Sequence, residues 1–183
     1  LRMGTLYETD AEAGQCQVLM RAIKSGTRTH SPAELQLNLI AAGATVDAGV
    51  SADMGLVELS AKREQGDRIA GLLAEIVLEP SFPDTAVDAA KQRCLADVAA
   101  DNESPLRATY AKFLDVMYHG SPLHRPVAGT VAAIAEIRRK DIVALHRKLF
   151  VGGNMVVCFA GNLDGKKTMA QLETLFGAAP VGA

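Results

Sequence analysis

Hydrophobic residues recur along most of the chain at intervals of three and four, the spacing of one face of an α-helix. Ile69, Leu72 and Ile76, for example, would lie on the same side of a helix. Ser31 and Glu34 form a capping box with Pro32 between them, which predicts a helix start. Helices are predicted over residues 13–24, 32–42, 65–78, 84–102, 105–117, 131–137, 139–150 and 166–176.

A different pattern, alternation of apolar and polar residues, marks a few short segments and predicts strands. Residues 44–52 and 55–62 alternate on either side of a turn, which predicts an antiparallel pair. Residues 1–8 alternate weakly and predict another strand, and the apolar run at 154–163 predicts a buried one. The expected fold class is therefore α+β, with one mixed or antiparallel sheet and helices layered on one face.

Composition narrows the class of protein. A chain of 183 residues, 49% hydrophobic, can bury an ordinary core without disulfides or a metal, and a net charge of −2 argues against nucleic acid and anionic membranes as partners. Cys16, Cys94 and Cys158 are far apart and predict reduced core thiols. The sequence shows no transmembrane or targeting signal, so a soluble protein of the bacterial cytoplasm or periplasm is expected, with the compartment itself left open.

Several stretches, taken in order, resemble the insulinase (pitrilysin) family of zinc peptidases, which includes the mitochondrial processing peptidase. They are the opening segment with Gly4 and Glu8, the helix closed by Gly26 and Thr27, the helix and ribbon of residues 33–53, the run of residues 78–130 and the closing strand. Together they cover almost the whole chain. The resemblance implies a metallohydrolase fold of the processing-peptidase type, in which residues 1–183 form a single domain that is a fragment of a two-domain precursor.

The residues that carry catalysis in this family are replaced here. Active members bind zinc with the two histidines of a helical His-x-x-Glu-His motif and with a distant glutamate, while the motif's own glutamate is the general base. Aligned on Gly26 and Thr27, the motif falls on Gln17, Met20 and Arg21. A methionine cannot accept a proton, and an arginine stays positive and repels a cation. The resemblance therefore implies no catalytic residue, no metal ligand and no bound zinc in this chain.

Asp97 stands where the family has its distant glutamate ligand. If the fold is retained, Arg21 and Asp97 would both point into the space that zinc occupies in active relatives. We therefore expect an Arg21–Asp97 ion pair to replace the metal as the link between two helices. The alternative is that these are two unrelated surface charges.

Other candidate chemistry is weaker. His30, His119, His124 and His146 form no metal-ligand set and are expected to be capping or solvated residues. No serine has a nucleophile-elbow context, and Cys16 has no recognisable base.

Three functions remain open. The preferred one is a catalytically silent domain or subunit that forms part of a peptide-binding chamber with a homologous, zinc-bearing partner, or a homodimer in isolation. Its ligand would be an unfolded peptide, contacted by Thr45, Val46, Asp47 and Ala48 of the ribbon. The alternatives are a purely structural scaffold, like the core subunits of the respiratory bc complex, and an active zinc peptidase with non-standard ligands.

Overall fold

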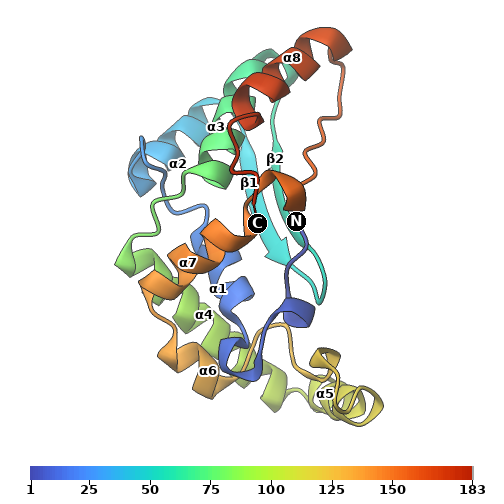
Figure 1. Ribbon diagram of the computed structural model, residues 1–183. Helices are drawn as coiled ribbons and strands as arrows, with labels where there is room; N and C mark the ends of the chain where they lie inside the picture. The colour runs from blue at the N-terminus through green and yellow to red at the C-terminus, as the bar shows by residue number, and fades with distance from the viewer. Residues whose placement is uncertain (183) are drawn as a thin grey trace.

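A computed structural model describes residues 1–182, and it packs helices against one face of a small two-stranded sheet (Figure 1). Within these residues the helices are α1 Gln15–Ala22, α2 Pro32–Ala41, α3 Gly66–Leu78, α4 Asp84–Glu103, α5 Pro105–Met117, α6 Val131–Glu136, α7 Arg139–Leu149 and α8 Gly165–Phe176. Short 3₁₀ helices lie at η1 Thr5–Tyr7, η2 Asp10–Glu12, η3 Arg63–Gln65, η4 Pro122–His124 and η5 Gly152–Asn154. All eight α-helices match predicted ones to within a few residues, and none in the described part of the chain is both long and apolar enough to cross a membrane.

The sheet consists of β1 (Thr45–Val50) and β2 (Gly55–Ser60), paired antiparallel with Asp47 opposite Glu58. Half-buried side chains alternate with exposed ones along both strands. The half-buried set, Val46, Ala48, Val50, Val57 and Leu59, packs against the hydrophobic core. Helices therefore cover one face of the sheet, as predicted, while Asp47 and Glu58 stand on the open face.

Hydrogen bonds at the hairpin turn fix which backbone groups point outward from the sheet. The N–H of Ser51 donates to the carbonyl of Met54, and Gly55 exchanges both of its backbone bonds with Leu1 rather than with β1. Because bonded and non-bonded pairs alternate in an antiparallel ladder, Val46 and Ala48 direct their backbone N–H and C=O groups away from β2. These two residues therefore form the free edge of β1.

Helix α1 lies at the centre of the core and packs against α4, α7 and β1. Val18, Leu19, Met20 and Ile23 are completely buried. Burial on almost every side explains why so short a helix is held firmly, since isolated helices of this length are marginal in water.

The predicted strand over residues 1–8 is wrong beyond its start. Arg2 forms an isolated antiparallel bridge with Met54, and the chain then turns at Gly4, where φ is +114°, into η1. A β-carbon at Gly4 would lie 2.2 Å from the carbonyl oxygen of Ser51, so the turn requires glycine. The carbonyls of Thr5 and Glu8 accept hydrogen bonds from the Arg125 side chain, which removes them from any sheet ladder.

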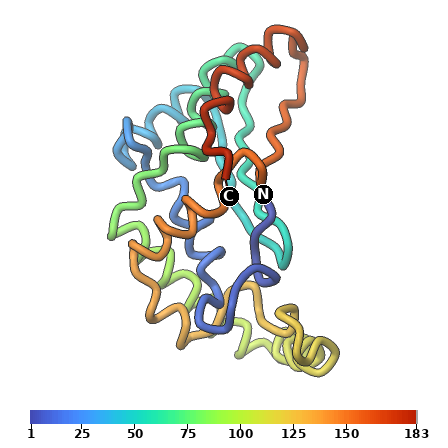
Figure 2. Tube along the Cα trace, viewed as in Figure 1, coloured from blue at the N-terminus to red at the C-terminus, as the bar shows by residue number. Residues whose placement is uncertain are grey.

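The predicted buried strand at 154–163 is also wrong. After η5 the chain runs extended to α8 without forming a strand with any other described residues (Figure 2). Val156 is 85% exposed and Cys158 is exposed, so the expectation that all three cysteines are core thiols fails for Cys158. A strand requires a partner for its backbone hydrogen bonds, and apolar composition alone does not supply one.

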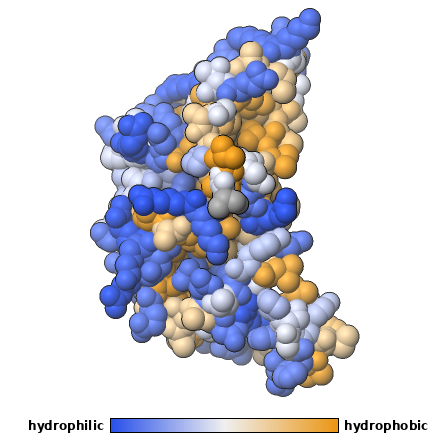
Figure 3. Space-filling view, in the orientation of Figure 1, coloured by the Kyte–Doolittle hydropathy of each residue, from blue (hydrophilic) through white to orange (hydrophobic). Residues whose placement is uncertain are grey.

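On the face shown in Figure 3, the places where hydrophobic side chains reach the surface include the region below α8, where this extended segment lies, and α5. On α5 the exposed apolar residues follow helical spacing: Leu106, Tyr110, Phe113 and Met117.

Candidate functional site

The positions that correspond to the peptidase motif lie on α1, and two of them form a polar cluster with α4. Gln17 and Arg21, one helical turn apart, share a face of α1. Nη2 of Arg21 donates to Oδ2 of Asp97, and with its amide oxygen turned toward Arg21, Gln17 accepts from Nε at 3.2 Å and from Nη2 at 3.3 Å. The expected ion pair between α1 and α4 is therefore present in the structure.

Met20, at the position of the general base, does not belong to this cluster. Its side chain is completely buried and lies near Gly55 together with Met3, because a β-carbon built on Gly55 would lie 2.2 Å from the sulfur of Met3 and 3.7 Å from Cε of Met20. Position 20 thus fills the core beneath the hairpin. A thioether buried in this way can neither accept nor deliver a proton.

The cluster does not fit a zinc ion. Gln17 offers only a neutral amide oxygen, Arg21 offers a permanent positive charge, and Asp97 already accepts the guanidinium hydrogen bond. Zinc sites in proteins need three or four His, Cys, Asp or Glu ligands. Within residues 1–182 no three such side chains converge in an arrangement that could hold a metal.

The predicted peptide-contacting residues lie on β1, which packs against α1. Thr45 to Ala48 form the first part of β1, and Nζ of Lys24, just beyond the end of α1, lies 3.9 Å from Oδ1 of Asp47. The open face of the ribbon bears a shallow groove of about 240 Å³ lined by Asp47, Ala48, Gly49, Val50, Ser51, Met54, Leu56 and Glu58. The structure thus packs β1 against α1 and brings Lys24 near Asp47, while the contact with a peptide stays a prediction.

Comparison with known protein families identifies the family to which this chain belongs. The family model for insulinase, peptidase family M16, matches residues 1–131, and the model for the peptidase M16 inactive domain matches residues 136–182. The chain belongs to the insulinase family. The first match ends at the first residue of α6 and the second begins at its last residue, although α7 packs on α1 in the same core.

Relatives of this insulinase-family chain include bacterial and mitochondrial proteins. An uncharacterized zinc protease of Rickettsia felis is 23% identical over 99% of the chain, and a probable mitochondrial-processing peptidase subunit beta of Schizosaccharomyces pombe is 22% identical over 95%. The chain spans only 44% and 38% of these two relatives, respectively.

Solved structures share the fold. A protease from Helicobacter pylori superimposes with a TM-score of 0.90 at 18% identity, covering 98% of this chain and 43% of its own. A peptidase M16 inactive domain from Pseudomonas fluorescens gives 0.90 at 21% identity, covering 98% and 44%, and the periplasmic protease PqqL from Escherichia coli gives 0.85 at 18%, covering 100% and 21%. At this level of identity the match shows the fold, and the α+β class is confirmed.

Two buried charged residues of this insulinase-family chain, Glu8 and Arg125, have structural roles that the sequence did not reveal. The Glu8 carboxylate accepts from the backbone N–H groups of Gly14 at 3.2 Å and Cys16 at 2.7 Å, which caps the N-terminus of α1. Arg125 is 7% exposed and donates to Asp10 and to the carbonyls of Thr5 and Glu8. The role of Arg125 has no local sequence signal, because its partners lie more than a hundred residues away.

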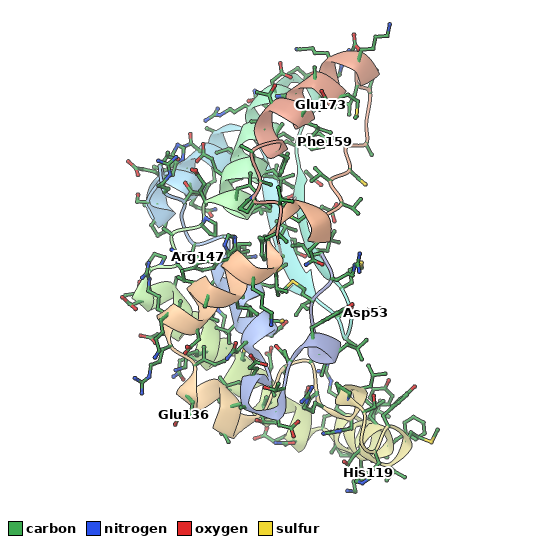
Figure 4. The ribbon with its side chains drawn as sticks, in the orientation of Figure 1. Asp53, His119, Glu136, Arg147, Phe159 and Glu173 are labelled. Atoms are coloured by element: carbon green, nitrogen blue, oxygen red, sulfur yellow. The ribbon has the colours of Figure 1, made fainter. Side chains whose placement is uncertain are left out.

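The cysteine and histidine side chains form no catalytic set in the described residues. Burial and the neighbouring Glu8 carboxylate raise the pKa of the Cys16 thiol, and burial raises that of Cys94 to about 11, so both stay protonated at neutral pH. His119 lies near α5, at the opposite end of the molecule from Phe159 (Figure 4). Nδ1 of His30 is 2.8 Å from the carboxylate of Glu75, a contact that ties the loop before α2 to α3.

His146 differs from the solvated residue expected from the sequence. Its ring stacks on Phe150 with centroids 4.4 Å apart and meets Phe82 edge-on at 5.5 Å, while Nε2 lies 2.8 Å from the carbonyl oxygen of Val77. Burial of the ring, with a smaller contribution from the Arg147 charge, lowers the pKa of His146, although the Val77 contact opposes the shift.

This shift predicts a pH dependence of stability. A histidine whose pKa is lower in the folded chain contributes stability that is fully present above its unfolded pKa of about 6.5 and is lost as pH falls through the folded value. The free energy of unfolding should therefore drop below about pH 6.5, by at most about 1.4 kcal/mol per pH unit from this residue. Urea unfolding of the wild type and of His146→Gln at several pH values checks this. Equal slopes in the two proteins between pH 6.5 and 5 would contradict the prediction.

The Arg21–Asp97 pair predicts a measurable coupling between α1 and α4. The side chains are 26% and 47% exposed, so solvent screens the pair and the coupling should be about 1 kcal/mol. A double-mutant cycle with Arg21→Met and Asp97→Leu, measured by urea unfolding, should return this value and a smaller one at high salt. Strictly additive single mutants would mean that the two charges are independent.

Proposed function

We propose that this chain is a catalytically silent insulinase-family domain that forms part of a peptide-binding surface, with zinc and catalysis supplied by a homologous partner domain or subunit. The observation that carries the proposal is the Gln17–Arg21–Asp97 cluster at the positions of the metal ligands. A guanidinium group replaces the cation and keeps α1 and α4 linked. The fold around a former site is thus retained while its chemistry is lost.

The free edge of β1 is the proposed contact for an unfolded peptide. Val46 and Ala48 direct backbone donors and acceptors away from β2, and an extended peptide can pair with such an edge as an additional strand. The edge runs beside the end of α1, where Lys24 approaches Asp47. A peptide added here would lie along the polar face of α1, next to the Gln17–Arg21–Asp97 cluster.

The partner would complete the enclosure around the peptide. Relatives more than twice as long as this chain have room for a second half, and a second homologous chain would serve equally. The silent domain then contributes orientation and exclusion of water rather than proton transfer.

A proline substitution on the edge tests the peptide contact. Proline removes an N–H but is tolerated where that N–H faces outward from a sheet. Val46→Pro should therefore reduce the binding of labelled unstructured peptides, measured by fluorescence anisotropy, at least about tenfold. Val46→Ala, the matched control, truncates the same side chain, retains the N–H, and should bind nearly as the wild type does. Absence of binding to the wild type, or equal binding to the two variants, would refute the proposal.

A further inference from the structure

A side chain of the protein itself already forms a hydrogen bond with the free edge of β1. Oδ1 of Asp47 accepts a hydrogen bond from the backbone N–H of the next residue, Ala48, at 2.9 Å. The ladder register directs this N–H away from β2, so it is one of the donors that an added strand would use. The Asp47 side chain is 90% exposed, and it therefore reaches this donor from the solvent side of the sheet.

A second contact links the same carboxylate to α1. Nζ of Lys24 lies 3.9 Å from Oδ1 of Asp47, so the oxygen that covers the Ala48 N–H also faces an ammonium group. Glu58 stands directly opposite Asp47 on β2, where like charges repel. Repulsion from Glu58 on one side and attraction to Lys24 on the other both favour the position of the Asp47 carboxylate at the edge.

We propose that Asp47 is a built-in competitor for the peptide-binding edge. Its carboxylate already accepts the hydrogen bond of the Ala48 N–H, which the carbonyl of an added strand would have to accept instead. This inference rests on the proposed function and specifies how the same surface is regulated. An incoming peptide displaces the carboxylate into water before it pairs with Ala48. The free energy of peptide binding is therefore reduced by the loss of the Asp47–Ala48 hydrogen bond. The competitor also protects an exposed strand edge from pairing with other chains.

Three variants separate the hydrogen bond from the charge. Asp47→Ala removes both and frees the Ala48 N–H. Asp47→Asn retains an oxygen that can accept this hydrogen bond but carries no charge. Glu58→Ala removes a neighbouring negative charge on the same face without freeing an edge donor, because the backbone groups of Glu58 pair with β1.

The experiment is titration of labelled unstructured peptides into the four proteins, followed by anisotropy, with thermal unfolding to verify the fold of each. Asp47→Ala should bind about fivefold more tightly than the wild type, which corresponds to loss of one exposed hydrogen bond. Asp47→Asn should gain less than Asp47→Ala, because its side-chain oxygen can still accept from the Ala48 N–H, and Glu58→Ala should gain less than Asp47→Ala, because it frees no edge donor. The exchange of the Ala48 amide proton should accelerate in the alanine variant and not in Glu58→Ala.

The remaining outcomes overturn the inference in distinguishable ways. Equal gains in Asp47→Ala and Glu58→Ala would mean that only charge matters. Weaker binding by Asp47→Ala would make Asp47 a peptide contact rather than a competitor. Unchanged peptide binding and unchanged Ala48 exchange would show that the carboxylate does not cover the edge. If peptides bind neither the wild type nor Asp47→Ala, the proposed function fails, and the inference fails with it.

Discussion

Gly129→Ala should destabilise the fold by more than about 3 kcal/mol, because the new methyl group would overlap the backbone of Ala13 and Gly14. A β-carbon at Gly129 would lie 2.5 Å from the carbonyl oxygen of Ala13 and 2.6 Å from Cα of Gly14, and neither can move without displacing the start of α1. Gly129 also has φ of +91°, a conformation that alanine adopts only at a cost. Chemical unfolding in urea measures the loss.

Gly120→Ala is the matched control for this substitution. Gly120 has φ of +80°, but a β-carbon there meets no described atom within 4 Å. Its replacement should therefore show backbone strain alone, about 1 kcal/mol. Similar losses in the two variants would mean that the close contact between the loop before α6 and the start of α1 contributes nothing.

Arg125→Met should cost about 3–5 kcal/mol, because the guanidinium is buried and joins the loop after α5 to the N-terminal segment. It donates to the carbonyl of Thr5 at 2.9 Å, to the carbonyl of Glu8 and to the Asp10 carboxylate. Methionine fills much of the volume but leaves two carbonyl groups without their donor. For a chain of this size the loss corresponds to a fall in melting temperature of about 10 °C, measurable by circular dichroism.

Two further variants distinguish burial from charge at Arg125. Arg125→Lys retains the charge but cannot reach several acceptors at once, so it should recover only part of the lost stability. Asp10→Asn changes a side chain that is 86% exposed and should cost little. A loss for Asp10→Asn as large as that for Arg125→Met would assign the stabilisation to the ion pair instead of to the buried carbonyl contacts.

The helices could be predicted from the sequence because their signals are local. The three- and four-residue spacing and caps such as Ser31 with Glu34 are contained within one or two turns, and the structure forms a helix at each predicted position. The β1–β2 ribbon was equally predictable from the sequence, because a hairpin's partner strands are neighbours in sequence.

Local sequence signals could not show whether residues 1–8 and 154–163 form strands. Strand formation depends on a distant partner for the backbone, and in the described residues the first segment is diverted to Arg125 after Arg2 while the second has no partner strand. Buried polar contacts can have the same non-local origin, and the hydrogen bonds from Arg125 to the N-terminal segment are an example.

The candidate site was more predictable than these strands. Spacing from Gly26 and Thr27 assigned Gln17 and Arg21 to one face of α1, and the Asp97 position on a later helix followed from the resemblance. The structure joins them. Sequence reasoning missed the hydrogen bond from Ala48 to Asp47, because the direction of an N–H at a sheet edge depends on the ladder register.

Zinc content is the measurement that tests the central claim most directly. The purified chain, dialysed after brief exposure to zinc, should retain almost no metal by elemental analysis, whereas a relative with an intact His-x-x-Glu-His motif treated in the same way should retain a full equivalent. This result is predicted because Gln17, Met20 and Arg21 provide neither ligands nor a base for zinc hydrolysis. A full equivalent of zinc in the wild-type chain, lost on Asp97→Ala, would contradict the account and reveal a metal site built from other ligands.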